Sequence, residues 1–127
     1  MTFVDTNVFM YAVGGPHPLR DPARAFFAEA LAGRTPLATS AEVLQELLHT
    51  YLPVHRTETL DAALALIEGC VEAVWPVEAE DVHMARSLAD RHPGLGARDL
   101  LHVACCKRRG ITAVKSYDRA LAAVFGS

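Results

Sequence analysis

The sequence alternates short apolar runs of β type with longer segments of helical periodicity, and this alternation constrains the fold more than any other feature. Strands are expected over 2–4, 37–38, 73–75 and 111–114. Apolar strands that alternate with amphipathic helices are typical of α/β folds, in which the strands pair mainly in parallel. We therefore predict an α/β fold with a short, mainly parallel central sheet.

The expected helices begin and end at residues that favour helix termini. We expect helices from Asp21 to Gly33, from Thr39 to Pro53, over 58–70, 78–90 and 98–109, and directly after Asp118. Thr39 and Glu42 have the spacing of a capping box, which predicts that the second helix begins there. The Gly14–Pro18 segment is the clearest loop, and it either borders a substrate groove or forms an ordinary surface turn.

Length and composition restrict the class of protein. A chain of 127 residues with 51% hydrophobic residues and a net charge of −3 suits a single compact domain and excludes a disordered chain. No apolar run approaches the roughly 18 residues of a membrane span, and the N-terminus lacks the features of a signal peptide. The three cysteines, Cys70, Cys105 and Cys106, have no disulfide or zinc spacing, which favours a reducing compartment. We expect one domain over 1–127, located in the cytoplasm and without membrane contact.

Basic residues concentrate in one segment of the chain. Residues 98–119 contain six basic and two acidic residues, whereas the rest of the chain contains six basic and thirteen acidic residues. Lys107, Arg108 and Arg109 lie at the end of an expected helix, where the helix dipole favours cations. This cluster is therefore either a solvated helix end or a phosphate-binding surface.

Four acids lie where parallel sheets place their sites, because ligands bind beyond the carboxyl ends of the strands. They are Asp5 after the first strand, Glu46 on the helix after the second strand, Asp99 in the first turn of a helix, and Asp118 after the last strand. Each also has a structural explanation, as a helix cap, a first-turn residue, a turn residue or a solvated residue. Glu42 and Glu46, however, form a like-charge pair four residues apart, which an isolated helix would avoid.

Convergence of the four acids would require a cation. Two carboxylates about 4 Å apart repel by roughly 4 kcal/mol at an effective dielectric constant of 20. Oxygen ligands without cysteine suit Mg²⁺ or Mn²⁺, and these ions polarise phosphoryl oxygens and lower the pKa of water. Acids in this arrangement, together with arginines suited to phosphate contact, indicate phosphodiester hydrolysis.

Four short motifs together resemble those of PIN-domain ribonucleases. They are, in order, Phe3–Asn7 (FVDTN), Ser40–Glu46 (SAEVLQE), Arg98–Ala104 (RDLLHVA) and Ser116–Arg119 (SYDR). The length resembles that of the stand-alone VapC-type toxins of bacterial and archaeal toxin–antitoxin pairs. The resemblance implies a three-layer α/β/α sandwich, and an enzyme that cleaves single-stranded or looped RNA.

The resemblance also implies roles for individual residues. By motif position, the catalytic and metal-binding acids are Asp5, Glu46, Asp99 and Asp118, and the residues that support them are Thr6, Asn7 and Ser116. The implied cofactor is Mg²⁺ or Mn²⁺, and hydrolysis is expected to leave a 5′-phosphate and a 3′-hydroxyl. Arg98 and Arg119 are candidates for contact with RNA phosphates. Leu121 departs from the family, which often has an aromatic residue at this position, and the departure concerns packing more than chemistry.

The implied partners are RNA as the substrate and a separately encoded antitoxin, in a homodimer or a hetero-oligomer with the antitoxin. The simplest inhibitor is a flexible segment that places an Arg or Lys among the acids. Two alternatives stay open: a housekeeping PIN-type RNA-processing nuclease, and a non-catalytic RNA- or protein-binding module. The presence of all four acids argues against the binding module, and so does the lack of an evident aromatic stacking platform.

Two histidines follow acids at a spacing of three residues. His49 follows Glu46, and His102 follows Asp99. Glu-x-x-His is also a motif of di-iron helical bundles, which indicates a metal-dependent oxidase or iron carrier as a further alternative. The strand pattern conflicts with that alternative. His102 is expected to be a core residue or to form a hydrogen bond with the acids.

Overall fold

A computed structural model describes residues 1–126, and Ser127, the last residue of the expected single domain, lies outside the described residues. The elements in chain order are β1 (Thr2–Val4), α1 (Thr6–Val13), α2 (Arg20–Ala32), β2 (Leu37–Ser40), α3 (Ala41–Tyr51), the 3₁₀ turn η1 (Leu52–Val54), α4 (Thr57–Cys70), β3 (Ala73–Trp75), α5 (Ala79–Ala89), α6 (Ala97–Arg108), β4 (Ala113–Lys115) and α7 (Arg119–Gly126). The predicted alternation of strands and helices is therefore confirmed.

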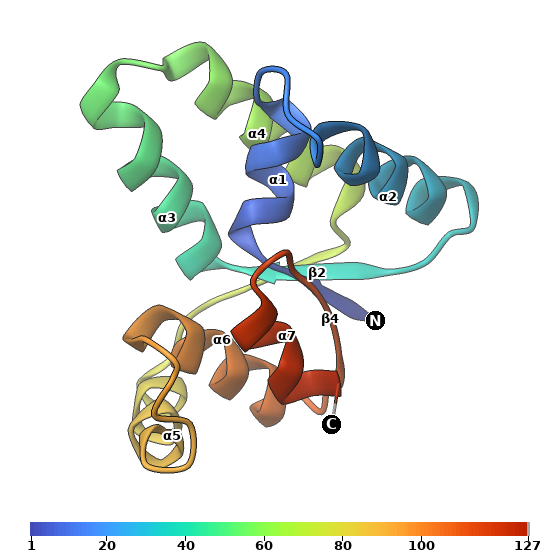
Figure 1. Cartoon of the computed structure of the whole chain (residues 1–127). Helices are drawn as coiled ribbons and strands as arrows, with labels where there is room; N and C mark the ends of the chain where they lie inside the picture. The colour runs from blue at the N-terminus through green and yellow to red at the C-terminus, as the bar shows by residue number, and fades with distance from the viewer. Residues whose placement is uncertain (127) are drawn as a thin grey trace.

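The four strands form one parallel sheet in the order β3-β2-β1-β4. Figure 1 shows α1–α4 on one face of this sheet and α5–α7 on the other, which confirms the three-layer α/β/α sandwich. Because all strands are parallel, their carboxyl ends meet at one edge of the sheet. The chain leaves β1, one of the two central strands, directly at Asp5.

Each helical layer has its own apolar core. In the α1–α4 layer, Val43, Leu47 and Tyr51 repeat every four residues along α3 and are buried against the sheet side of the helix. In the α5–α7 layer, Leu121 of α7 is fully buried with Leu88, Leu100 and other apolar residues. Leu121, which stands where the family often has an aromatic residue, therefore packs in the core of this layer.

The capping box predicted from Thr39 and Glu42 is wrong. Thr39 belongs to β2, and its hydroxyl donates to the carbonyl oxygen of Val4 on the neighbouring strand at 2.9 Å. Ser40 is the N-cap residue of α3, without a hydrogen bond from its side chain to the helix. A capping box forms instead at the start of α5, where the side chains of Glu78 and Asp81 bond reciprocally with the backbone.

The basic end of α6 is neither fully solvated nor free for phosphate. Arg108 Nη1 and Arg109 Nη1 lie 2.7 and 3.0 Å from Oδ1 of Asp81, which is fully buried on α5. Burial disfavours the Asp81 carboxylate, but hydrogen bonds from Arg109, the Glu78 backbone and Arg108 outweigh burial and lower its pKa to about 2. These charges join α5 to α6, and only Lys107 of the cluster lacks a part in this network.

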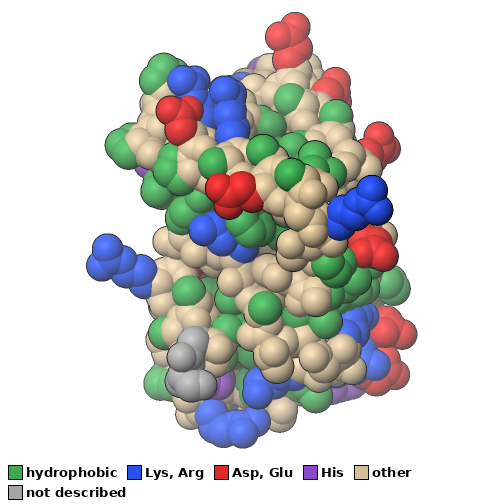
Figure 2. Space-filling model, turned by 90° about the vertical axis from the view of Figure 1, so that its right-hand side faces the viewer, with side chains coloured by type: hydrophobic (Ala, Val, Ile, Leu, Met, Phe, Trp, Pro, Cys, Tyr) green, Lys and Arg blue, Asp and Glu red, His purple; other side chains and the backbone are tan. Residues whose placement is uncertain are grey.

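The surface mixes charged and apolar side chains. On the face shown in Figure 2, Lys and Arg side chains lie near the top, the middle and the bottom, and no continuous basic stripe joins them. None of the helices in the described part of the chain is both long and apolar enough to cross a membrane.

Candidate metal centre and active site

Asp5 stands at the point where β1 ends and α1 begins. It is the N-cap residue of α1, and its Oδ1 accepts a hydrogen bond from the backbone N–H of Thr6 at 2.7 Å. Its Oδ2 accepts a hydrogen bond from the Ser116 hydroxyl, also at 2.7 Å. The side chain is therefore held in one orientation at the carboxyl edge of the sheet, with 5% of its residue surface exposed. The Asp5 carboxylate is therefore both the N-cap of α1 and a candidate metal ligand.

Glu46 reaches the same edge from the middle of α3. It is buried, and its Oε2 accepts a hydrogen bond from the Thr6 hydroxyl, while Arg98 Nε lies 3.9 Å from its Oε1. Burial opposes ionisation, but the neighbouring His102 and Thr6, with the charge of Arg98, lower the pKa of Glu46 below its ordinary value. These neighbours therefore favour the ionised form of Glu46, and because the side chain is buried, the explanation of Glu46 as a solvated residue is wrong.

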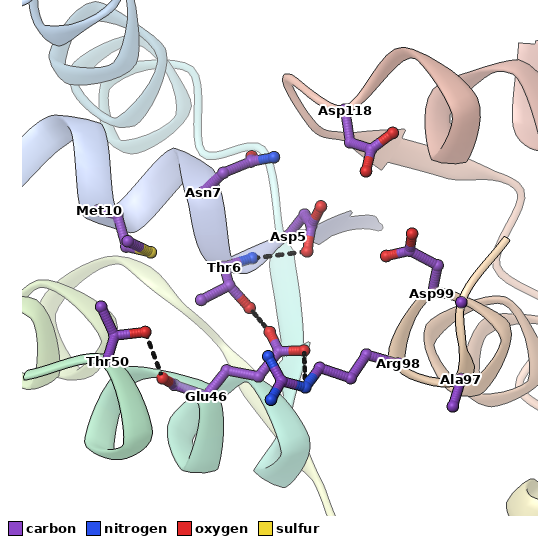
Figure 3. Close-up of a pocket in the computed structure, with 11 residues that line it drawn as sticks. Asp5, Thr6, Asn7, Met10, Glu46, Thr50, Ala97, Arg98, Asp99 and Asp118 are labelled. Carbon is purple, nitrogen blue, oxygen red and sulfur yellow. Dashed lines mark hydrogen bonds and ion pairs between the residues drawn. The ribbon is translucent and has the colours of Figure 1, made fainter.

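Asp99 and Asp118 complete the acidic group from the other side. Asp99 lies in the first turn of α6, where burial and the negative charges of Asp118, Asp5 and Glu46 raise its pKa. Asp118 Oδ1 accepts hydrogen bonds from the backbone N–H groups of Ala120 and Leu121 at the start of α7. Figure 3 shows the carboxylates of Asp99 and Asp118 directed toward the space beside Asp5.

All four predicted acids line one cavity of about 530 Å³ at the carboxyl edge of the sheet. The cavity is also lined by Thr6, Asn7, Met10, Thr50, Gly96, Ala97 and Arg98. It lies between the two helical layers, so that α1 and α3 supply one wall and α6 supplies the other (Figure 3). The convergence that sequence spacing left open is thus present in the fold.

Asn7 and Ser116 connect the first motif to the last. Asn7 Nδ2 donates to the Ser116 hydroxyl at 3.4 Å, and Asn7 Oδ1 accepts from the backbone N–H of Tyr117 at 3.1 Å. Ser116 Oγ accepts in turn from the N–H of Asp118 at 3.0 Å. These bonds fix the loop after β4 against α1, and thereby the position of Asp118 relative to Asp5.

His102 lies behind the acids and was not among the predicted site residues. It is 1% exposed, and its Nε2 lies 3.4 Å from Glu46 Oε1 and 3.7 Å from Asp5 Oδ1. Within the described residues, neither ring nitrogen has a hydrogen-bond partner. Burial opposes protonation, but Glu46 and the charges of Asp5 and Asp99 outweigh it and raise the pKa of His102. The three-residue spacing from Asp99 was the sequence signal for this position.

The residues present fit a divalent cation. Ligand atoms of Asp5, Glu46 and His102 all lie within 4.8 Å of one another. The buried imidazole without a hydrogen-bond partner faces this group, and Asp99 experiences the repulsion that a cation would relieve. Carboxylate-rich donor sets suit Mg²⁺ and Mn²⁺.

Of the remaining candidates, only Arg98 lines this cavity. Arg98 lines it with a half-exposed side chain, whereas Arg119 is exposed at the start of α7 and is not among the lining residues. His49 is exposed on α3 and lies outside the lining, so the paired Glu-x-x-His site of a di-iron protein is not formed. Glu42 does not line the cavity either, and Glu46 alone of this pair joins the acids.

Comparisons with known proteins agree with this architecture. The PIN domain family matches residues 2–125 of the chain. Over 127 residues, and over the full length of both proteins, the chain is 61% identical to Ribonuclease VapC23 of Mycobacterium tuberculosis. It is 42% identical over 119 residues to Ribonuclease VapC13 of the same species, which covers 94% of this chain and 91% of that protein. The crystal structure of Mycobacterium tuberculosis VapC20, described as a Sarcin-Ricin loop cleaving toxin, has the same fold: the TM-score is 0.73 at 23% identity, with 98% of this chain and 95% of that chain covered.

Proposed function

The chain belongs to the PIN-domain family and, within it, to the VapC ribonucleases, and on this premise we propose that it is a metal-dependent endoribonuclease and the toxin of a toxin–antitoxin pair. We propose further that residues 1–127 form one nuclease domain, that it acts in the cytoplasm, and that it assembles as a homodimer or with its antitoxin.

One observation carries the proposal: four carboxylates from four separate segments line a single cavity at the carboxyl edge of the sheet. Mutual repulsion makes such a group costly unless a cation binds there. The raised pKa of Asp99 is the local sign of this cost. A structural role gives no reason for four acids to meet, whereas a metal-dependent hydrolase uses such a group to hold its cation.

The proposed roles follow from the contacts of each residue. Asp5 and Glu46 hold the cation, with Thr6 and Ser116 fixing their carboxylates by hydrogen bonds. Asp99 and Asp118 bind from the opposite wall of the cavity. A bound Mg²⁺ or Mn²⁺ supplies Lewis acidity toward the phosphodiester and lowers the pKa of water. Arg98, at the cavity mouth, is placed to contact a phosphate of the RNA.

The proposed control is by a separately encoded antitoxin. A flexible segment of this partner would place a cationic side chain among the acids, where it competes with the metal for the same negative potential. Its binding must offset an ordering cost of about 2–5 kcal/mol. RNA cleavage is thereby blocked until the partner is removed.

Cleavage of total cellular RNA by the purified protein tests the enzymatic part of the proposal. We expect Mn²⁺- or Mg²⁺-dependent cuts with 5′-phosphate and 3′-hydroxyl ends, which disappear in excess EDTA and in Asp99→Asn. Binding of RNA that is left intact in the presence of metal would support the non-catalytic module instead.

Expression with and without the neighbouring gene tests the toxin part. We expect expression of the wild-type protein alone to arrest growth, expression of Asp5→Asn to leave growth unaffected, and the neighbour-encoded protein to co-purify. An active nuclease that leaves growth unaffected and recruits no neighbour would be a housekeeping RNA-processing enzyme.

A further inference from the structure

We propose that a second cavity beside the acids is a nucleobase subsite, which receives one unpaired base of the RNA next to the cleaved bond. This inference rests on the proposed ribonuclease function. The cavity has a volume of about 320 Å³ and is lined by Asn7, Met10, Tyr11, Gly14, Thr50, Tyr51, Val54 and Arg56. It lies between α1, the end of α3 and η1.

The second cavity lies directly beside the acid cavity. Asn7, Met10 and Thr50 line both of them. Figure 3 shows Met10 and Thr50 on the side of the acid cavity that lies away from Asp99 and Asp118. An RNA strand whose phosphate lies at the acids therefore reaches the second cavity with an adjacent nucleotide.

The chemistry of the lining changes between the two cavities. Four carboxylates line the first, whereas the lining of the second contains no carboxylate and one cationic side chain, Arg56. Of the two cavities, only the first therefore offers carboxylate ligands to a metal ion. The second offers an aromatic ring, apolar walls and a guanidinium group, which are the groups that bind unpaired bases.

Tyr11 is held in place by its neighbours. Its half-buried ring lies 4.5 Å from the ring of His17 and meets the ring of Tyr117 edge-on at 5.6 Å. His17 belongs to the Gly14–Pro18 loop, so this loop borders the second cavity. Tyr117 directly precedes Asp118, so the same aromatic contacts connect the subsite to the acid loop. A rigid ring costs little entropy on stacking.

Gly14 permits this loop to stay close to α1. A Cβ atom at this position would lie 2.9 Å from the carbonyl oxygen of Met10, which is closer than packed atoms allow. Arg56 lines another part of the second cavity. Its guanidinium lies over the ring of the buried Tyr51, 5.7 Å from the ring centroid, and its Nη2 donates to the Thr59 hydroxyl at 3.4 Å. Arg56 is thus positioned at the cavity while it remains exposed.

An abasic scan tests the subsite with RNA as the probe. Oligoribonucleotides that span the main cleavage site mapped in total RNA would carry a single abasic nucleotide at each position in turn. We expect one position near the cut at which removal of the base lowers kcat/KM by about tenfold or more, within the range of base–aromatic stacking. Tyr11→Leu and Arg56→Gln should each reduce this ratio at that position alone. Arg91→Gln, an exposed arginine in the turn after α5, is the matched control and should leave the scan unchanged.

The outcomes separate the subsite from the function on which it rests. If no RNA is cleaved by the wild-type protein, the proposed function fails and the subsite fails with it. If RNA is cleaved but the scan is flat, or if both variants keep the wild-type ratio, the subsite alone is refuted. A uniform loss at every position in Arg56→Gln would show a phosphate contact and would also refute it. Arg56 is exposed, so its variant keeps the test valid even if Tyr11→Leu impairs folding.

Discussion

His102 and Glu46 approach within 3.4 Å, although the first lies on α6 and the second on α3, on opposite faces of the sheet. Both side chains are buried. The contact therefore joins the two helical layers at the carboxyl edge of the sheet, directly beside Asp5.

Replacing His102 should weaken metal binding more than it disturbs packing. His102→Leu keeps an apolar side chain but removes the polar group next to Glu46, and we expect Mn²⁺ to bind about 10–100-fold more weakly. His102→Gln keeps an amide donor and should lose less. Calorimetric titration with Mn²⁺ measures the difference. Val103→Ala, a fully buried neighbour, is the control that loses packing and should retain Mn²⁺ affinity. Wild-type affinity in His102→Leu would show that the contact does not position Glu46.

Asp99→Asn should stabilise the metal-free protein. The raised pKa of Asp99 means that the fold favours its protonated form, so the ionised carboxylate destabilises the protein at neutral pH. Removing the charge should raise the Tm measured in EDTA, by about 2–8 °C for each kcal/mol gained. Asp61→Asn, exposed on α4, should change stability by no more than about 0.5 kcal/mol. A lower Tm in Asp99→Asn would assign this side chain a structural role.

Divalent ions should stabilise the wild-type protein but not its acid variants. A ligand that binds only the folded state adds about 2.7 kcal/mol at a hundredfold excess over its Kd. We expect Mn²⁺ or Mg²⁺ to raise the Tm accordingly, and this gain should be lost in Asp99→Asn. Zn²⁺ and Fe²⁺ should not be required for cleavage. Full cleavage in excess EDTA would remove metal from the mechanism.

Asp5→Asn should abolish cleavage and leave the fold intact. The amide oxygen of Asn can still accept the hydrogen bond from Thr6 N–H, so we expect a change of no more than about 1 kcal/mol in unfolding free energy. Both variants lose the oxygen that accepts from the Ser116 hydroxyl, but only Asp5→Ala also removes the helix cap, which should cost about 0.5–2 kcal/mol more. Urea unfolding in EDTA compares the two. Equal losses would mean that the charge, and not the cap, stabilises the protein.

Asp81 should make stability depend on pH in the acid range. Its pKa in the folded protein is about 2, below the ordinary 3.8, so its stabilising effect is full above pH 4 and is lost as the pH falls through 2. The shift corresponds to about 2 kcal/mol, which Asp81→Asn should remove at pH 7. The exposed Arg86–Asp90 pair supplies the control, because Asp90→Asn should cost less than about 1 kcal/mol. The unfolding free energies of Asp81→Asn and Asp90→Asn should converge as the pH falls to about 2. A difference between them that stays constant with pH would contradict the role assigned to Asp81.

Local sequence patterns predicted those strands and helices that neighbouring residues in the chain determine. An apolar run followed at once by Asp5 predicted β1 and its carboxyl end, because strand pairing and polarity act there over a few residues. The capping box at Thr39 failed because the Thr39 hydroxyl bonds to Val4, which lies 35 residues away in the chain. Local spacing cannot reveal that competition.

Long-range contacts explain what else the sequence left open. From the sequence, Arg108 and Arg109 were either solvated or phosphate-binding residues. The fold shows that both instead pair with Asp81 of α5. Tyr11 and Tyr51 lie 40 residues apart in the sequence, and they line one cavity only because α1 and α3 come together in the fold. The roles of the acids themselves stay predictions that the variants above will decide.

The position of β1 between β2 and β4 also affects when the cavity can form during synthesis on the ribosome. Asp5 is synthesised 111 residues before its hydroxyl partner Ser116, and Ser116 and Asp118 both follow β4, the last strand of the described chain. Chains are synthesised from the N-terminus, so a nascent chain that already contains Asp5 lacks one wall of the cavity until residues 96–118 have been synthesised. A nascent chain that ends before Asp99 and Asp118 therefore lacks part of the acid group while it is still attached to the ribosome, which itself contains RNA.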